Sequence, residues 1–233
     1  MTKSDLNKEK KAAAEKAVEF IESGMLVGLG TGSTVRFMIE SLAEKIKNGL
    51  DIKAISTSNA TSRFAESLGI TVLNFSDVDE IDLTIDGADE VDQNLNGIKG
   101  GGGALLYEKI VASSSKKNIW MVDSTKSVEQ LGSFPLPLEV VPFGANKTFN
   151  KLFSLGYKPK FRTVDGKNYV TDGNHYIIDL QLNKIEKPKE LNNKLLLIPG
   201  VIETGLFLEI CDVLIVSAGD ECKIVSKKWK RPA

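Results

Sequence analysis

Apolar runs alternate with amphipathic segments through roughly the first 130 residues of the chain. Continuous apolar runs predict buried strands, and a helical apolar repeat predicts helices. The predicted strands are 24–30, 52–57, 71–75, 81–86 and 118–123, and the predicted helices are 12–21, 34–46, 60–69 and one that follows Gly103. This alternation is typical of an α/β fold, in which helices cover both faces of a mainly parallel sheet.

The pattern changes after residue 132. The order becomes strand, helix, two strands, helix and strand, at 138–143, 146–156, 158–164, 168–182, 187–198 and 200–207. That order resembles a ferredoxin-like α+β unit. The apolar run 212–217 is expected to return to the first sheet. We therefore predict a discontinuous first domain, 1–132 with 206–233, and a smaller α+β domain, 133–205, inserted before the C-terminal strand.

Composition and charge narrow the class of protein. The chain has 233 residues, 42% of them hydrophobic, which is enough for one large or two small cores. A net charge of -1 and a pI near 6.0 give no electrostatic case for nucleic acid as the main partner. The basic C-terminal end, "KKWKRPA", is interpreted as a short solvated tail. No apolar window reaches the length of a membrane span, and the N-terminal segment lacks a signal-peptide apolar run. We expect a cytoplasmic protein.

Histidine and cysteine usage limits the chemistry further. Cys211 and Cys222 lie outside any CxxC pattern, so neither a disulfide framework nor a structural zinc site is suggested. The single histidine, His175, excludes sites built on paired histidines within one chain, and its hairpin-like context predicts a surface position. If the protein is an enzyme, carboxylates and lysines must carry its proton transfers.

A glutamate falls on the apolar face of the helix after the glycine run. At 100° per residue, Glu108 lies among Leu105, Val111 and Ala112. One interpretation is a slipped register or a side chain that reaches out to solvent. The other is a catalytic carboxylate held in a poorly hydrated site.

Four polar clusters, 31–34, 57–61, 86–90 and 123–126, each follow a strand-like run. The carboxyl ends of parallel strands lie along one edge of a sheet, and ligands bind there. We therefore expect the clusters to contribute to one site at that edge.

The first cluster lies in "GLGTGST", which is not a dinucleotide fingerprint. Ser33 stands where a third glycine is needed, and 56–58 lack the acidic residue that should end the second strand. A P-loop lysine is missing as well. The remaining features are Thr31, Gly32, Ser33 and Thr34 at a helix N-terminus. They suit either a plain N-cap or a single phosphate, and Lys126 at a neighbouring strand end favours the phosphate.

The "DGADE" cluster places Asp86 and Asp89 just past a buried strand. They are either solvated acids in an Asp-Gly turn or a pair of functional carboxylates, and their spacing does not match an EF-hand. Lys99 either neutralises them or faces an oxyanion. The run from Gly100 to Gly103 lets backbone approach a ligand, and its N–H groups suit an anion.

The ordered set of motifs carries a family resemblance. "GLGTGST", "TIDGADEVD", "KGGGGALLYEKIVA", "DSTK", "FPLPLEVVPF", "YVTDGN" and "PGVIETGLF" follow one another along nearly the whole chain. Each is weak alone, but together they resemble ribose-5-phosphate isomerase of type A. Departures such as Gly144 and the C-terminal segment 220–233 lie outside the site motifs.

The resemblance implies a reaction, a site and a fold. The reaction is the interconversion of ribose 5-phosphate and ribulose 5-phosphate through an enediolate, in the non-oxidative pentose phosphate pathway. Glu108 is the implied general base, with Asp86, Asp89 and Lys99 as further catalytic residues. The implied sugar-phosphate site comprises Thr31, Gly32, Ser33, Thr34, Asp86, Gly87, Ala88, Asp89, Lys99, Gly100, Gly101, Gly102 and Lys126. Lys10 on the first helix is implied to contact the phosphate.

No metal and no cofactor are implied. The implied fold joins a Rossmann-like domain to a ferredoxin-like one, and the implied assembly is a homodimer or homotetramer.

Two rival functions remain. An amino-sugar phosphate deaminase or a coenzyme A transferase would use the same fold on another ligand, and a sugar-phosphate sensor would need a separate DNA-binding module, for which the first helix leaves no room.

Overall fold

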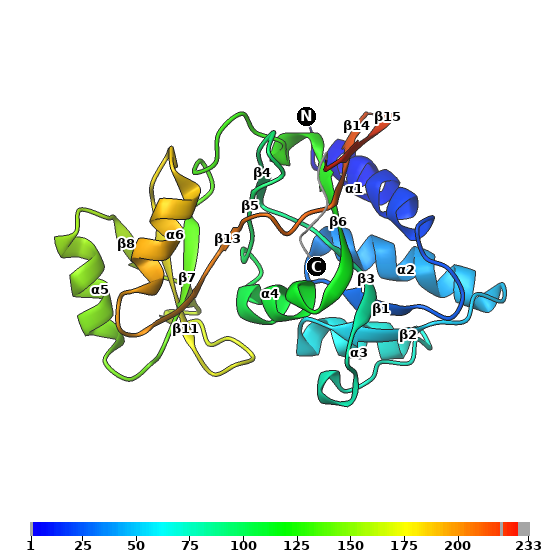
Figure 1. Cartoon of the computed structure of the whole chain (residues 1–233), viewed down its shortest axis with the longest axis horizontal. Helices are drawn as coiled ribbons and strands as arrows, with labels where there is room; N and C mark the ends of the chain where they lie inside the picture. Colours follow the sequence, from blue (N-terminus) through cyan, green and yellow to red (C-terminus); the bar gives the residue numbers. More distant parts are fainter. Residues whose placement is uncertain (1, 220, 228–233) are drawn as a thin grey trace. The chain divides into compact units, whose positions relative to one another are not determined.

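The computed structural model describes residues 2–219 and 221–227, so the basic tail, apart from Lys227, lies outside the described residues. The chain divides into two compact units (Figure 1). The first unit comprises Met1–Ala88, Tyr107–Ser127 and Ile210–Ala233, and the second comprises Asp89–Leu106 and Val128–Glu209. In this division residues 89–106, which the predicted domain borders place in the first domain, cluster with the second unit.

The first unit is built on a six-stranded sheet in the order β15-β14-β6-β3-β1-β2. The strands are β1 (Leu26–Leu29), β2 (Lys53–Ser56), β3 (Ile81–Asp86), β6 (Ser115–Asp123), β14 (Val213–Ala218) and β15 (Glu221–Ser226). All neighbours are parallel except β14 and β15. The mainly parallel sheet is confirmed, including the return of the late apolar run as β14. The antiparallel edge strand β15 was not predicted.

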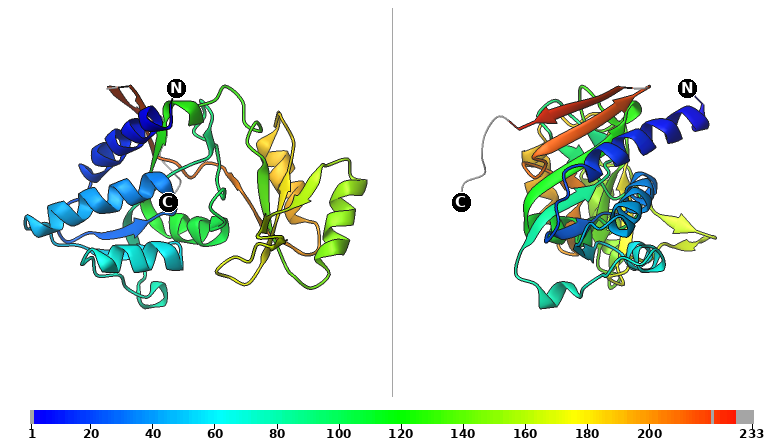
Figure 2. Two further views of the ribbon diagram at one scale, coloured as in Figure 1. Left: turned by 180° about the vertical axis from the view of Figure 1, so that it is seen from behind. Right: turned by 90° about the vertical axis from the view of Figure 1, so that its right-hand side faces the viewer.

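Helices cover both faces of this sheet, as Figures 1 and 2 show. They are α1 (Lys3–Val18), α2 (Ser33–Lys47), α3 (Asn59–Ser67) and α4 (Leu105–Ser113). Val27 and Leu29 of β1 enter the core shared with α1, α2 and α3. Gly28, between them, has no space for a side chain, because a Cβ there would lie 1.9 Å from Thr84 Oγ1 of β3 and 3.0 Å from Val111 Cγ1 of α4. The missing side chain therefore lets α4 pack closely on the opposite face.

The predicted strand at 71–75 is wrong. Only Val72 forms a bridge, to Ala54 of β2. Asn74 then accepts a hydrogen bond from the Ser76 N–H and caps the short 3-10 helix η1 (Phe75–Asp77). An apolar run thus lost strand pairing to the local turn chemistry of an asparagine.

The second unit contains a four-stranded antiparallel sheet in the order β12-β7-β11-β8. Its elements are β7 (Leu136–Val140), α5 (Ala145–Ser154), β8 (Pro159–Phe161), β11 (Tyr176–Leu180), α6 (Pro188–Leu196) and β12 (Val201–Thr204). The fourth, first, third and second strands along the chain therefore lie side by side, which confirms the ferredoxin-like topology. A hairpin of β9 (Thr163–Val164) and β10 (Lys167–Asn168) follows β8, and β4 (Glu90–Val91), β5 (Gly97–Ile98) and β13 (Leu206–Phe207) form a small sheet.

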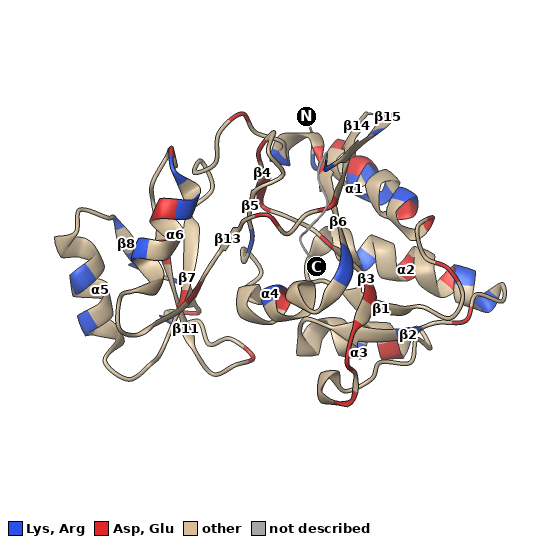
Figure 3. Cartoon of the chain, viewed as in Figure 1, with Lys and Arg blue, Asp and Glu red and all other residues tan. Residues whose placement is uncertain are grey.

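Most helices carry side chains of both signs (Figure 3). Helix α1 carries Lys10, Lys11 and Lys16 together with Glu9 and Glu15, whereas the charged residues of α5 are both lysines, Lys147 and Lys151. Among the described residues, no helix has both the length and the apolar character that a membrane span requires.

We predict that the two cysteines differ sharply in reactivity. Burial raises the pKa of the Cys211 thiol to about 12, because a thiolate there would lose its hydration, whereas Cys222 is only partly buried. Titration of the native protein with a thiol reagent at pH 8 should modify Cys222 rapidly and Cys211 only after unfolding. Cys222→Ser should abolish the rapid phase; a rapid phase that survives this substitution would contradict the burial of Cys211 just before β14.

Candidate functional site

At the start of α2, a hydroxyl group of this helix meets an ammonium group of α1. The N-cap is Gly32, with φ at 132°, and no side chain caps the helix. Lys10 Nζ of α1 instead donates a hydrogen bond to Ser33 Oγ over 3.2 Å. The plain N-cap interpretation of Ser33 or Thr34 is therefore wrong. A lysine beside the N–H groups of a helix N-terminus suits an anion.

Thr31 is held by the cluster that follows β2. Its Oγ1 lies 2.8 Å from Thr57 Oγ1 and donates to Ser58 Oγ over 2.8 Å. Thr61 Oγ1 donates to the Gly30 carbonyl over 2.9 Å. The polar cluster 57–61 thus holds the loop after β1 in place through these hydrogen bonds. The sequence pattern alone could not tell such a supporting role from direct contact with a ligand.

Asp86, at the end of β3, is buried beneath the same loop. Its Oδ1 accepts the N–H groups of Thr31, over 3.1 Å, and of Gly87, over 2.7 Å. Gly30 has no space for a side chain, because a Cβ there would lie 1.9 Å from that oxygen. Asp86 is therefore no solvated turn residue: its carboxylate joins the loops after β1 and β3.

Glu108 is buried on α4, with 3% of its surface exposed. Leu105, Val111 and Ala112 on the same helix are buried with it. The slipped-register and solvent-reaching interpretations are therefore wrong, and the helix does place a carboxylate on its apolar face.

Lys126 lies on the short 3-10 helix η2 (Ser124–Lys126), which a buried glutamate anchors. Glu9 of α1 accepts the Ser124 N–H, over 3.0 Å, the Ser124 hydroxyl, over 2.8 Å, and the Gly219 N–H, over 2.9 Å. Burial alone raises the pKa of Glu9, but these hydrogen bonds together outweigh it and leave that pKa below its usual value. The sequence reasoning missed Glu9.

In the second unit, the glycine run forms a tight turn beside Asp89. The Gly103 N–H donates to the Gly100 carbonyl over 2.9 Å, and the Gly101 N–H donates to Asp89 Oδ2 over 2.7 Å. Two amides expected to face a ligand are therefore used within the protein. Lys99, which precedes the turn, is buried, and its Nζ lies 5.2 Å from the centre of the Phe207 ring.

His175 is not the surface residue that was predicted. Its Nδ1 lies 3.0 Å from Oε1 of Glu139, a buried residue of β7, and its side chain is 25% exposed. Thr171 Oγ1 donates to the same oxygen over 2.9 Å. The hairpin context indicated exposure, but the facing strand supplies a buried acceptor.

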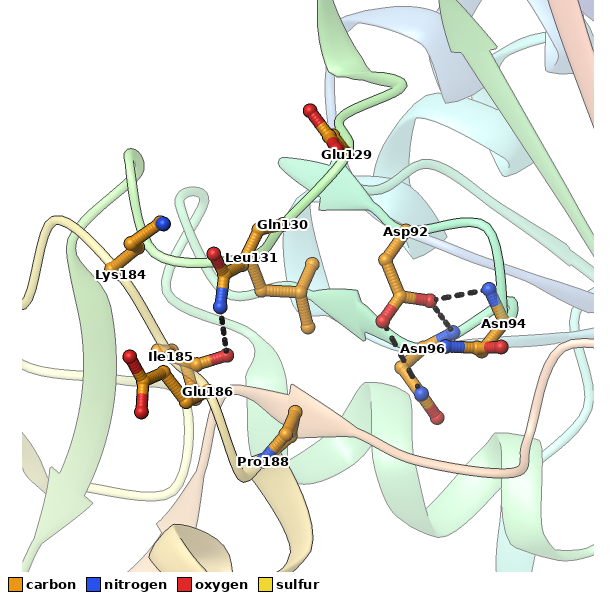
Figure 4. A pocket seen from close by; sticks show the side chains of 10 residues that line it. All are labelled: Asp92, Asn94, Asn96, Glu129, Gln130, Leu131, Lys184, Ile185, Glu186 and Pro188. Carbon is orange, nitrogen blue, oxygen red and sulfur yellow. Dashed lines mark hydrogen bonds between the residues drawn. The ribbon is translucent and has the colours of Figure 1, made fainter.

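Of two pockets, one lies away from the predicted clusters, and the other is lined in part by Ser58 and Asn59 of the cluster 57–61. One, of about 360 Å³, lies in the second unit between Asp92, Asn94 and Asn96 on one side and Lys184–Glu186 on the other (Figure 4). The other, of about 340 Å³, lies in the first unit and is lined by Ser56, Ser58, Asn59, Phe75, Ser76, Tyr107, Ile110 and Val111. Within the described residues, no group of three or more histidine, cysteine, aspartate or glutamate side chains is arranged to hold a metal ion.

A family model, curated relatives and solved structures with TM-scores near 0.9 point to one family. The family model of ribose 5-phosphate isomerase A (phosphoriboisomerase A) matches residues 53–221. The ribose-5-phosphate isomerase A of Levilactobacillus brevis is 50% identical over 226 residues, covering 96% of this chain and 99% of that protein. The ribose 5-phosphate isomerase of Plasmodium falciparum superposes with a TM-score of 0.92 at 36% identity, over 96% of this chain and 100% of that one. A D-ribose-5-phosphate isomerase in complex with phospho-erythronic acid superposes with a TM-score of 0.91 at 38% identity, over 95% of this chain and 99% of that one.

We predict that Glu9→Gln destabilises the protein at neutral pH but not in acid. A lowered folded pKa contributes stability above the unfolded value of 4.5, and that contribution is lost as the pH falls through the folded pKa. Urea unfolding should show a loss on the order of 1 kcal/mol at pH 7 that vanishes towards low pH. Glu15→Gln, at an exposed position of the same helix, is the control. A loss that is equal at both pH values would contradict a charged Glu9.

Proposed function

We propose, since this chain belongs to the ribose 5-phosphate isomerase A family, that it interconverts ribose 5-phosphate and ribulose 5-phosphate. The observation that carries the proposal is the buried carboxylate of Glu108, on the helix that follows the glycine turn. Moving a proton between C1 and C2 of a sugar requires a base that can remove a proton from one carbon. The base must then hold this proton until it returns it to the other carbon. A carboxylate shielded from water limits loss of that proton to solvent.

The proposed mechanism passes through an enediolate. Glu108 removes the proton from C2 of the open-chain aldose and returns it to C1. Negative charge develops on the adjacent oxygens, and the buried ammonium group of Lys99 is the proposed partner for it, because a preorganised charge stabilises an oxyanion most where water is excluded. Asp86 and Asp89 are proposed to move hydroxyl protons and to open the furanose ring, without a division of roles between them.

The phosphate is proposed to bind at the start of α2. Lys10 and Ser33 already meet there, and Gly32, Thr34 and Lys126 complete the proposed set. Binding energy from this unreactive end of the substrate positions the carbons that react. The rest of the sugar site is proposed to be lined by the backbone of Thr31, Gly87, Ala88, Gly100, Gly101 and Gly102.

We further propose that the enzyme works without metal or cofactor, as a homodimer or homotetramer in the cytoplasm, in the non-oxidative pentose phosphate pathway. The family resemblance supports each of these points. Incubation with ribose 5-phosphate, with ribulose 5-phosphate as the measured product, tests the function. A chain that released ammonia from an amino-sugar phosphate, or bound ribose 5-phosphate without converting it, would belong to one of the rival functions.

We predict that Glu108→Gln abolishes isomerisation without unfolding the protein. The amide keeps the shape of the side chain and removes the base, so the rate should fall on the order of a hundredfold or more. The melting temperature should not fall, because a buried carboxylate carries a desolvation cost that an amide lacks. In deuterated water the wild type should incorporate a measurable fraction of label at the migrating position, because shielding slows the exchange of the proton on the base without stopping it, and the variant should lose exchange and turnover together.

The control for this variant is Glu66→Gln, at an exposed position on α3. Exchange by Glu108→Gln at a rate close to that of the wild type would assign the base to another residue, with Asp86 and Asp89 as the next candidates.

We predict that Lys126→Ala weakens use of the phosphorylated substrate. The loss of one charged hydrogen bond should cost about 1.5–3 kcal/mol in kcat/KM, which is roughly tenfold to a hundred-and-fiftyfold. Steady-state kinetics measures this effect, and Lys53→Ala, at the amino end of β2, should leave kcat/KM unchanged. An unchanged kcat/KM for Lys126→Ala would remove Lys126 from the phosphate site.

A further inference from the structure

The carbonyl groups of the glycine turn are held by two side chains of the second unit. Arg162 Nη1 donates to the Gly100 carbonyl over 2.7 Å and to the Gly101 carbonyl over 3.1 Å. The Tyr169 hydroxyl donates to the Gly102 carbonyl over 3.3 Å. Three successive carbonyls are thus bound from one side, by residues at the two ends of the β9–β10 hairpin.

The guanidinium group of Arg162 is itself fixed. Its Nε donates to Asp179 Oδ2 over 3.0 Å, and its Nη2 donates to Asp179 Oδ1 over 2.5 Å. The two side chains are only 16% and 21% exposed, and Asp179 lies on β11, between β7 and β8. A two-point pair of this kind sets the plane of the guanidinium as well as its position. The pair with Asp179 therefore also fixes the position of Nη1, the atom that donates to the carbonyls of Gly100 and Gly101.

The geometry of the peptide group passes this constraint to Asp89. In a trans peptide the C=O and N–H point in opposite directions, and the described residues contain no cis peptide. The carbonyl of Gly100 points to Arg162, so the N–H of Gly101 points away from it and meets Asp89 Oδ2 over 2.7 Å. By the same rule, the Gly102 N–H leaves the turn on the side away from the guanidinium.

Glycine is required for these contacts. A Cβ on Gly101 would lie 2.6 Å from Asp89 Oδ1, and one on Gly103 would lie 2.5 Å from the Tyr169 ring. Consecutive glycines lose more conformational entropy on ordering than any other residues, so this turn needs an external anchor to keep one conformation.

We propose that Arg162 is a positioning residue for isomerisation. It does not contact the sugar; held by Asp179, it fixes the glycine turn, so that Asp89 and the Gly102 N–H present one geometry to the reacting end of the substrate. This inference rests on the proposed function, in which Asp89 moves hydroxyl protons.

The kinetic test replaces Arg162 and separates kcat from KM. Arg162→Gln should lower kcat on the order of tenfold or more while KM changes little. The value of kcat falls because catalytic groups that are less well positioned stabilise the transition state less. The value of KM is kept because the residues proposed to bind the phosphate are not among those that hold the glycine turn. Arg162→Lys should recover part of kcat, since it keeps the charge without the two-point pair. Tyr169→Phe, which removes only the hydroxyl, should give a smaller loss. Lys151→Gln, at an exposed position of α5, should behave as wild type.

A second readout does not depend on activity. In protein labelled with ¹⁵N-glycine and ¹⁵N-isoleucine, the Gly101 amide should exchange with solvent at least about tenfold faster in Arg162→Gln, while the Ile178 amide of β11 keeps its rate. Unchanged kcat, a rise in KM alone, or unchanged Gly101 exchange would each overturn the inference. If the wild type does not convert ribose 5-phosphate, the proposed function fails, and the exchange rates alone still decide whether Arg162 holds the turn.

Discussion

The register of the parallel strands determines the first unit's part of the candidate site. Leu29 at the end of β1 pairs with Ser56 of β2 and with Ile85 of β3. The loops after these strands therefore begin at the same level, which brings Thr31 within reach of Thr57 on one side and Asp86 on the other. A slip by one residue would turn every side chain of a strand to the other face, so the apolar cores that fix the register also fix the polar contacts.

Carboxylates organise the loops of both units by accepting backbone N–H groups. Asp86 accepts Thr31 and Gly87 in the first unit. In the second unit Glu90 accepts Gly132 and Phe134, each over 2.6 Å. A buried carboxylate needs several donors to offset its lost hydration, and loop amides need acceptors, so each stabilises the other. Loops rich in glycine thereby acquire fixed conformations from acids on regular elements.

The local spacing of apolar residues predicted the helices, the strands and the side chains that they bury. It missed the contacts that a side chain makes with residues far away in the sequence. The two larger sheets, apart from β15, and the burial of Glu108 followed from apolar spacing. Glu9 carried a similar signal, since it lies four residues before Ala13 on a buried stripe, but its lysine-rich surroundings hid it. Nothing in the sequence near Arg162 indicates the glycine turn, because that contact joins segments about sixty residues apart. The same limit explains His175, whose buried acceptor Glu139 comes from another strand.

The antiparallel strand β15 has a consequence for the solubility of the chain. It covers one edge of β14, whose sequence "VLIVSA" is almost wholly apolar and whose other edge pairs with β6. An uncovered apolar edge is a template on which a second molecule can add a strand, and repetition of that step leads to aggregates. β15 replaces that edge with one that carries Glu221 and Lys223, and charges on an outer strand discourage further pairing. The last described element of the chain thus acts as a barrier to self-association through the six-stranded sheet.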